Sequence, residues 1–170
     1  MRKFILLFVS ATMVSAGLFF HSNQALGELT DSGRYIDQMT SSSFVIPEGW
    51  DVKNVSWTDG YIEPGIIQLN KDGDMITIRK VESNNGLEAS KQELQKIAAE
   101  YTEEPVIVNS MQYDHLVSSF RGEDGTEGTY EGYFLSRESK NYAIELYSRF
   151  ETYPANKDAV MNLVNSFQYQ

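Results

Sequence analysis

The sequence predicts an α+β domain in which an antiparallel β-sheet is flanked by helices. In five ranges β-branched and other apolar residues form short runs or alternate with polar ones, as in strands: 66–69, 75–81, 111–121, 128–137 and 142–150. After the second and the last of these ranges the apolar spacing changes to about 3.6 residues, as in helices. Short turn sequences join the last three strands, which indicates an antiparallel meander.

The first two strands are joined by residues 70–74, whose Asp-Gly pair is typical of a hairpin. The first helix is expected to end at Pro105, and its apolar stripe consists of Leu87, Leu94, Ile97, Ala98 and Tyr101. The second helix begins at Pro154, a residue suited to a first helical turn, and its stripe consists of Ala159, Val160, Leu163, Val164 and Phe167. In the last strand the residues expected to face the core are Tyr142, Ile144, Leu146 and Phe150.

Residues 1–27 have the layout of an export signal. Two basic residues precede an uncharged apolar run from Phe4 to Phe20, and small residues up to Gly27 offer a cleavage site. We therefore expect the mature chain to begin near Glu28, outside the cytoplasm, either secreted or in the cell envelope. The alternative is an uncleaved membrane anchor, because the run lies at the lower edge of the about 17 to 25 residues that span a bilayer.

The chain is acidic and contains no cysteine. Its 24 Asp and Glu residues oppose 14 Lys and Arg residues, for a net charge of −10, and loss of the signal makes the charge two units more negative. Such a charge repels nucleic-acid phosphates and argues against nucleic-acid binding. Without cysteine the chain forms no disulfide, binds no metal through thiolates and carries no cysteine-linked lipid, so its fold depends on apolar packing.

Residues 28–43 are polar, and we expect a linker or a short docking helix with one weak helical turn around Tyr35. The ordered domain is residues 44–170. It opens with a short strand over 44–47 that a proline ends, and the following Glu-Gly turn brings Trp50 back over one end of the core.

The opening stretch Phe44-Val45-Ile46-Pro47-Glu48-Gly49-Trp50 resembles the entry motif of the PsbP-like superfamily, which includes the photosystem II subunit PsbP and the bacterial envelope protein DcrB. The order of hairpin, central helix, meander and final helix, ending in Asn165-Ser166-Phe167, is similar too. The resemblance covers nearly all of residues 44–170. It implies a PsbP-like αβα sandwich and a role in binding or assembly, and it assigns no functional residue because the matching residues build the first strand and turn.

The reactive and metal-binding residue types of the sequence form no recognisable catalytic motif, so we expect no enzyme, no cofactor and no metal centre. His115 is the only histidine after the signal, which excludes a pair of imidazoles, and the sequence has no Gly-x-Ser-x-Gly elbow. The loop around Gly73 fails as a calcium loop, because Gln68 and Arg79 stand at its first and twelfth positions, where carboxylates are required. A looser oxygen site stays open, either at Asp72 and Asp74 or at Glu123, Asp124 and Glu127.

Tyrosine content favours binding, since the chain has 10 Tyr and all of them follow the signal. Tyrosine suits interfaces because its ring is apolar and its hydroxyl is polar. The residues of a possible binding face for a peptide or glycan are Trp57, Tyr130, Tyr133 and Tyr147. The alternative is that these side chains lie in ordinary core under the flanking helices.

The sequence therefore predicts an exported, non-catalytic binding or accessory module of the cell envelope or extracellular space, with a protein or glycan partner outside the cytoplasm. Two alternatives are a small hydrolase acting on an envelope or extracellular polymer and a divalent-cation-responsive module. A deep cleft with two convergent carboxylates favours the hydrolase, whereas a shallow aromatic and acidic face favours the binding module.

Overall fold

The computed structural model describes residues 27–38, 40–53, 66–98, 100–121 and 125–169. The apolar run of the predicted signal and the candidate binding residue Trp57 lie outside these ranges. Within them, no helix is both long enough and apolar enough to cross a membrane.

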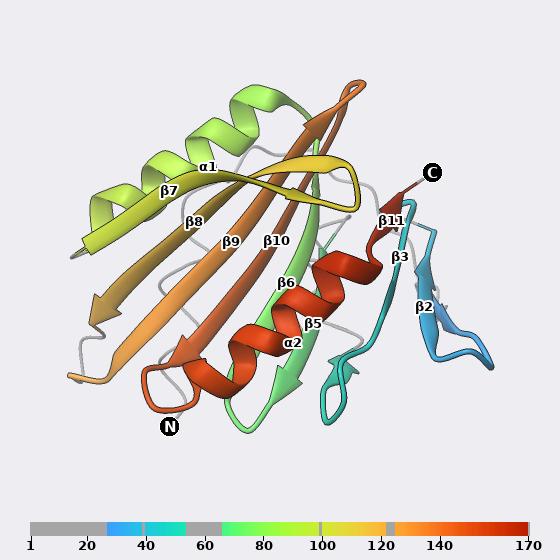
Figure 1. Cartoon of the computed structure of the whole chain (residues 1–170), viewed down its shortest axis with the longest axis horizontal. Helices are drawn as coiled ribbons and strands as arrows, with labels where there is room; N and C mark the ends of the chain where they lie inside the picture. The colour runs from blue at the N-terminus through green and yellow to red at the C-terminus, as the bar shows by residue number, and fades with distance from the viewer. Residues whose placement is uncertain (1–26, 39, 54–65, 99, 122–124, 170) are drawn as a thin grey trace, which may run out of the picture.

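The main sheet of the described chain has seven strands. They are β4 (Asp51–Lys53), β5 (Ile66–Lys71), β6 (Asp74–Val81), β7 (Glu100–Val108), β8 (Met111–Arg121), β9 (Glu127–Arg137) and β10 (Lys140–Arg149). All neighbours pair antiparallel in the order β4-β5-β6-β10-β9-β8-β7 (Figure 1). The predicted strands over 66–69, 75–81, 111–121, 128–137 and 142–150 are therefore confirmed, as is the α+β class.

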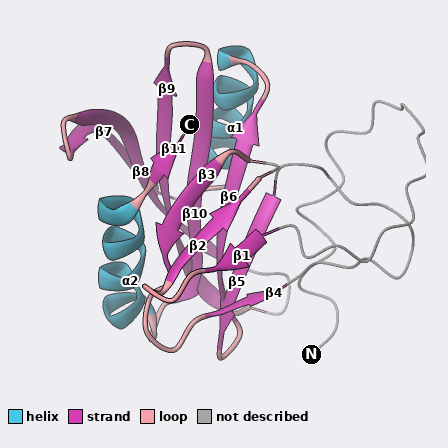
Figure 2. Ribbon diagram, turned by 90° about the vertical axis from the view of Figure 1, so that its right-hand side faces the viewer, coloured by secondary structure: helices cyan, strands magenta, loops and turns pink. Residues whose placement is uncertain are grey.

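The two helices cover opposite faces of this sheet (Figure 2). Helix α1 (Asn84–Ile97) packs in a cluster that includes Phe134, and helix α2 (Tyr153–Ser166) packs in a cluster that includes Leu135. Because successive residues of a strand point to opposite faces, these two neighbours on β9 place the helices on opposite sides of the sheet. The layering is the αβα sandwich that the resemblance implies.

A second sheet corrects the expectation for residues 28–43. Instead of a linker or short helix, this segment contributes to strands β1 (Gly27–Leu29), β2 (Arg34–Asp37) and β3 (Ser42–Val45), which form a four-stranded sheet with β11 (Gln168–Tyr169) at the C-terminal end. Tyr35, at the predicted helical turn, is buried in β2 against Phe44. These short polar strands depend on pairing partners such as β11, far away in the sequence, so local periodicity does not predict them.

Helix α1 is shorter than predicted. It begins after Ser83, whose side-chain oxygen accepts a hydrogen bond from the Gly86 backbone N–H at 3.2 Å, and it ends at Ile97. Tyr101 and Pro105 therefore lie in β7, so Tyr101 is not part of the helix and Pro105 does not mark its end. Pairing of all nine residues of β7 with β8 overrides the helical spacing, and a proline is tolerated because β7 is the edge strand of the sheet.

The core lies mainly between the sheet and α2. Trp50 is buried there as predicted, and so are Val160, Leu163, Val164 and Phe167 of the α2 stripe. Phe150 does not face the core, because β10 ends one residue earlier, and its side chain is exposed.

Three tight turns connect neighbouring strands. Asp72-Gly73, Asn109-Ser110 and Glu138-Ser139 each have positive φ at both residues, the backbone that two-residue hairpins of type I′ require. The first confirms the predicted hairpin. The other two lack the glycine that makes such turns recognisable in a sequence.

Candidate functional site

An open crevice lies at one end of the main sheet, where β8 and β9 separate. The ladder between these strands stops at the pair Asp114 and Phe134, although β8 begins at Met111 and β9 continues to Arg137. The crevice has a volume of about 450 Å³, within the range of about 300–1,000 Å³ usual for ligand pockets. Its walls are formed by Ser110, Gln112, Asp114, Phe134, Leu135, Ser136 and Arg137.

The crevice exists because the β7–β8 hairpin bends toward α2. Figure 1 shows the tip of this hairpin, in yellow, curling toward the C-terminal end of α2. There the Asn109 side-chain amide donates a hydrogen bond to the backbone carbonyl of Asn165. Val108 and Met111, on either side of the turn, pack on the core beneath the hairpin. These contacts hold the beginning of β8 away from the end of β9.

Two strand edges consequently face the crevice. Residues 135–137 of β9 pair with β10 on one side, and residues 111–113 of β8 pair with β7 on one side. Neither stretch has a ladder partner on its other side within the described chain. Ile107, on the neighbouring strand β7, pairs with Gln112 of the crevice wall and has 75% of its surface exposed.

The one carboxylate in the crevice walls is held by a lysine of α1. Lys91 Nζ lies 3.0 Å from Asp114, 2.8 Å from Glu88 and 3.2 Å from Glu103, and the lysine side chain is only 7% exposed. Burial lowers the pKa of Lys91, but the hydrogen bonds that its ammonium donates to these three carboxylates raise it more, so the net pKa is above its usual value. This cluster ties α1 to β7 and β8 and keeps the lysine charged.

A second polar cluster lies on the opposite face, beside the start of α2. Glu131 is 0% exposed and accepts hydrogen bonds from the hydroxyls of Tyr133 at 2.7 Å and Tyr153 at 3.0 Å. It also lies 2.9 Å from Nε2 of His115, whose ring stacks on Tyr133. Burial raises the pKa of the Glu131 carboxyl, but the three hydrogen bonds lower it more, and the net pKa is below its usual value.

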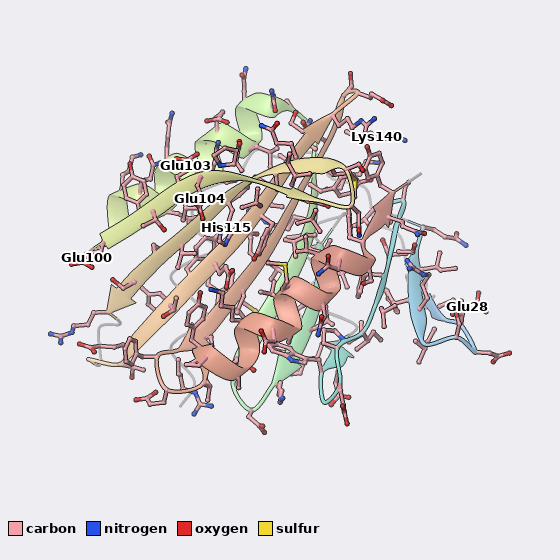
Figure 3. The ribbon with its side chains drawn as sticks, viewed as in Figure 1. Glu28, Glu100, Glu103, Glu104, His115 and Lys140 are labelled. Carbon is pink, nitrogen blue, oxygen red and sulfur yellow. The ribbon has the colours of Figure 1, made fainter. Side chains whose placement is uncertain are left out.

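The geometry around His115 indicates a structural role. A catalytic imidazole uses one nitrogen for the orienting carboxylate and presents the other to a nucleophile. Here the second nitrogen, Nδ1, faces Glu104 on β7 at 3.9 Å, and Figure 3 shows the two residues next to each other. The cluster instead anchors Tyr153, and with it the first turn of α2, to the sheet.

A third cluster surrounds Glu145 on the α1 face. The Glu145 carboxylate is 2% exposed and receives two hydrogen bonds from the Arg79 guanidinium, at 2.6 and 2.9 Å. The Tyr130 hydroxyl donates a third at 3.0 Å. The carboxylate raises the pKa of Arg79, mainly through its charge. The buried charge is thus compensated within the chain.

Two of the four residues of the possible binding face, Tyr130 and Tyr133, lie in the core. Tyr130 and Tyr133 are buried, at 1% and 0% exposed, and their hydroxyls bind Glu145 and Glu131 instead of facing a ligand. Tyr147 is half-buried, with its ring 5.0 Å from that of Tyr130. The alternative of ordinary core under the helices therefore agrees with the burial of Tyr130 and Tyr133.

Sequence reasoning missed the two buried glutamates, although the sequence carries a signal for them. Glu131 and Glu145 interrupt β9 and β10, which otherwise read as nearly continuous apolar and aromatic runs. Such runs are typical of strands covered on both faces. A charged residue inside one is therefore expected to be buried and paired.

The acidic residues of the loops do not cluster in the part of the chain that the structure describes. There, no three Asp, Glu or His side chains are grouped as metal ligands would be. Asp74 is buried and accepts hydrogen bonds from the Asn156 side chain at 2.7 Å and the Arg149 backbone at 2.9 Å. Glu123 and Asp124 lie outside the described residues.

Comparison with known proteins supports the fold. No protein-family model matches the sequence, and no curated protein sequence is significantly similar to it. A crystal structure from Bacteroides thetaiotaomicron matches 81% of the chain at 14% identity with a TM-score of 0.57, and the match spans 48% of that protein. CyanoP, the cyanobacterial PsbP of Synechocystis, matches 91% of this chain and 98% of its own at 13% identity, with a TM-score of 0.52.

LpqN of Mycobacterium tuberculosis, a protein involved in cell envelope biogenesis, matches 75% of this chain and 82% of its own at 11% identity, with a TM-score of 0.49. Identities this low are evidence for the shared fold alone. The chain has a PsbP-like fold, and the resemblance that the opening motif indicates is confirmed at that level.

Proposed function

We propose that this protein is an exported, non-catalytic module that binds a partner protein outside the cytoplasm, in the cell envelope or its surroundings. The observation that carries the proposal is the chemistry of the crevice. Its walls supply one carboxylate, Asp114, and Lys91 holds that group at 3.0 Å. A hydrolase of the glycosidase type needs two carboxyl groups, about 5 to 10 Å apart, that face one cleft.

The buried acids support a non-catalytic role as well. Glu131 and Glu145 each accept hydrogen bonds from several side chains of the same domain. Catalytic acids and bases instead keep a proton-accepting position open toward the substrate. The hydrogen bonds of these two carboxylates connect strands and a helix, so their role is structural.

A protein partner fits the crevice better than a glycan does. The glycan alternative depends on a platform of exposed tyrosine rings, and Tyr130 and Tyr133 are buried. The crevice offers strand edges, and an exposed apolar side chain, Ile107, lies on β7 opposite Gln112 of the crevice wall. Backbone edges and apolar anchors are features that recognise polypeptides. The export layout of residues 1–27 supports a partner outside the cytoplasm.

Site-specific photocrosslinking in intact cells tests this proposal. The photoreactive amino acid benzoylphenylalanine replaces Gln112 in the crevice or, as a matched control, the exposed Lys157 on α2 of the epitope-tagged full chain. We expect an extracytoplasmic product that begins near Glu28 and a discrete adduct from position 112 but not from position 157. A cytoplasmic product contradicts the proposal, as does cleavage of an envelope polymer that is lost in Asp114→Asn.

A further inference from the structure

We infer that the crevice binds an extended peptide segment of the partner, which adds as a short strand to the free edge of β9. This inference rests on the proposed binding function, and it names the site and the chemistry of recognition. The peptide backbone, and not a particular charged side chain, is the group that the crevice recognises.

The free edge of β9 is the first reason. Leu135, Ser136 and Arg137 pair with Tyr142, Asn141 and Lys140 of β10, while their ladder with β8 has already ended at Phe134. An antiparallel strand directs backbone N–H and C=O groups to both sides in alternation. The side of β9 that faces the crevice therefore presents hydrogen-bonding groups that an added strand would satisfy.

The rigidity of this edge is the second reason. Leu135 is buried in the core, and the Ser136 hydroxyl donates to the Asn141 side chain at 2.8 Å across the β9–β10 pair. The tight turn at Glu138-Ser139 then joins the two strands directly. An edge held in strand geometry before binding loses little conformational entropy when a peptide pairs with it.

The charge balance of the walls is the third reason. Asp114 is paired with Lys91, and Arg137 lies 3.4 Å from the neighbouring Glu138. The remaining polar wall residues are uncharged, so the crevice favours neither a cationic nor an anionic ligand. The three residues of β9 that have no partner on β8 span about 10 Å at roughly 3.3 Å per residue. The site therefore suits a neutral, extended segment of about three residues.

The outer edge of the sheet, on β7, is less suited to strand addition. It carries Glu100, Glu103 and Glu104, which Figure 3 shows along the strand, and Pro105 interrupts its backbone donors. Charged residues and proline are the devices by which edge strands avoid pairing with other chains. The end of β9 at the crevice, residues 135–137, carries neither an acidic residue nor a proline.

Disulfide tethering tests the inference, because the chain has no cysteine of its own. Gln112→Cys places a thiol in the crevice, and Lys157→Cys places one on the exposed face of α2 as the matched control. The probe is the peptide acetyl-Cys-Gly-Thr-Val-Thr-Val-amide, supplied as its mixed disulfide with 2-mercaptoethanol and equilibrated with each variant by thiol–disulfide exchange in excess 2-mercaptoethanol. A second probe has the same sequence with its Val backbone nitrogens methylated, which removes main-chain donors and leaves the side chains unchanged.

We expect the first probe to be retained at least tenfold more strongly at Gln112→Cys than at Lys157→Cys, and the methylated probe to lose that advantage. Amide hydrogen exchange at residues 135–137 should slow in the tethered complex. Equal retention at the two cysteines, or equal retention of the two probes, overturns the inference. A wild-type dimer in solution that Ile107→Asp dissociates overturns it as well, since the occupant is then a second copy of the chain.

Tethering and photocrosslinking together separate a failure of the strand-addition inference from a failure of the proposed function. If tethering shows no preference while the photocrosslink at position 112 still forms, the partner binds at the crevice in another way and only the strand-addition inference fails. If the photocrosslink at position 112 is absent as well, the proposed function fails with it.

Discussion

Replacing Tyr153 by phenylalanine removes one hydroxyl from the first turn of α2. That hydroxyl donates at 3.0 Å to Oε2 of Glu131, whereas His115 and Tyr133 bind the other carboxylate oxygen. Oε2 then loses this donor in a carboxylate that is fully buried. Leaving a buried acceptor unsatisfied costs about 1–3 kcal/mol. We therefore expect the free energy of unfolding at pH 7 to fall by about that amount in Tyr153→Phe.

The pH dependence of this loss follows from the lowered pKa of Glu131. A carboxyl whose folded pKa lies below its unfolded value stabilises the protein above the unfolded pKa, and this contribution is lost as the pH falls through the folded pKa. The hydroxyl of Tyr153 is one of the groups that lower the pKa. The difference between wild type and Tyr153→Phe should thus be constant near neutral pH and shrink below about pH 4.5.

Urea unfolding followed by tryptophan fluorescence, at pH 7 and in steps down to pH 3, measures both effects. Tyr101→Phe is the matched control, because it removes a hydroxyl from a side chain that is 49% exposed on β7. We expect the control to change the free energy of unfolding by less than about 0.5 kcal/mol. A loss in Tyr153→Phe no larger than in the control, or one of the same size at pH 3 and pH 7, would refute the reasoning.

Three further substitutions test the other clusters and turns by the same urea unfolding. Arg79→Leu leaves the Glu145 carboxylate buried and unpaired and should cost about 3–5 kcal/mol, whereas Arg121→Leu, which breaks an exposed ion pair, should cost less than about 1 kcal/mol. Ser139→Gly relieves a residue with φ of 65° and should stabilise the protein by about 1 kcal/mol, and no gain would show that the turn is unstrained. Gly132→Ala places a methyl group 2.5 Å from the Tyr130 hydroxyl and should cost about 1–3 kcal/mol, so a neutral effect would contradict the packing.

Elements whose residues repeat a local pattern were predictable from the sequence. The strands at 111–121 and 128–137 and the helix opened by Pro154 follow from alternation, helical spacing and turn residues within each segment. The fold class and the PsbP-like resemblance follow from the order of these segments. The export layout is likewise a local pattern, and it stays a prediction.

Elements that depend on distant partners were not predictable in this way. Strand β7 continues the apolar spacing of α1 through Tyr101, and only its pairing with β8 makes it a strand. The pairing of β3 with β11 joins Ser43 to Gln168, from opposite ends of the domain. The stability of such short strands comes from their partners, which local propensity does not describe.

In the candidate site, too, some features follow from the sequence and others depend on the tertiary structure. The sequence determined that this domain is acidic, free of cysteine and, after residues 1–27, left with His115 as its one histidine, and these facts argue against thiolate and paired-imidazole chemistry. It did not decide which polar residues are buried: Tyr130 and Tyr133 became core, because α1 and α2 cover both faces of the sheet. The crevice is a tertiary feature too, since the contact of Asn109 with α2 parts β8 from β9. Alternation specifies which residues share a face of a strand, but only packing decides whether that face meets water, a helix or an unpaired edge.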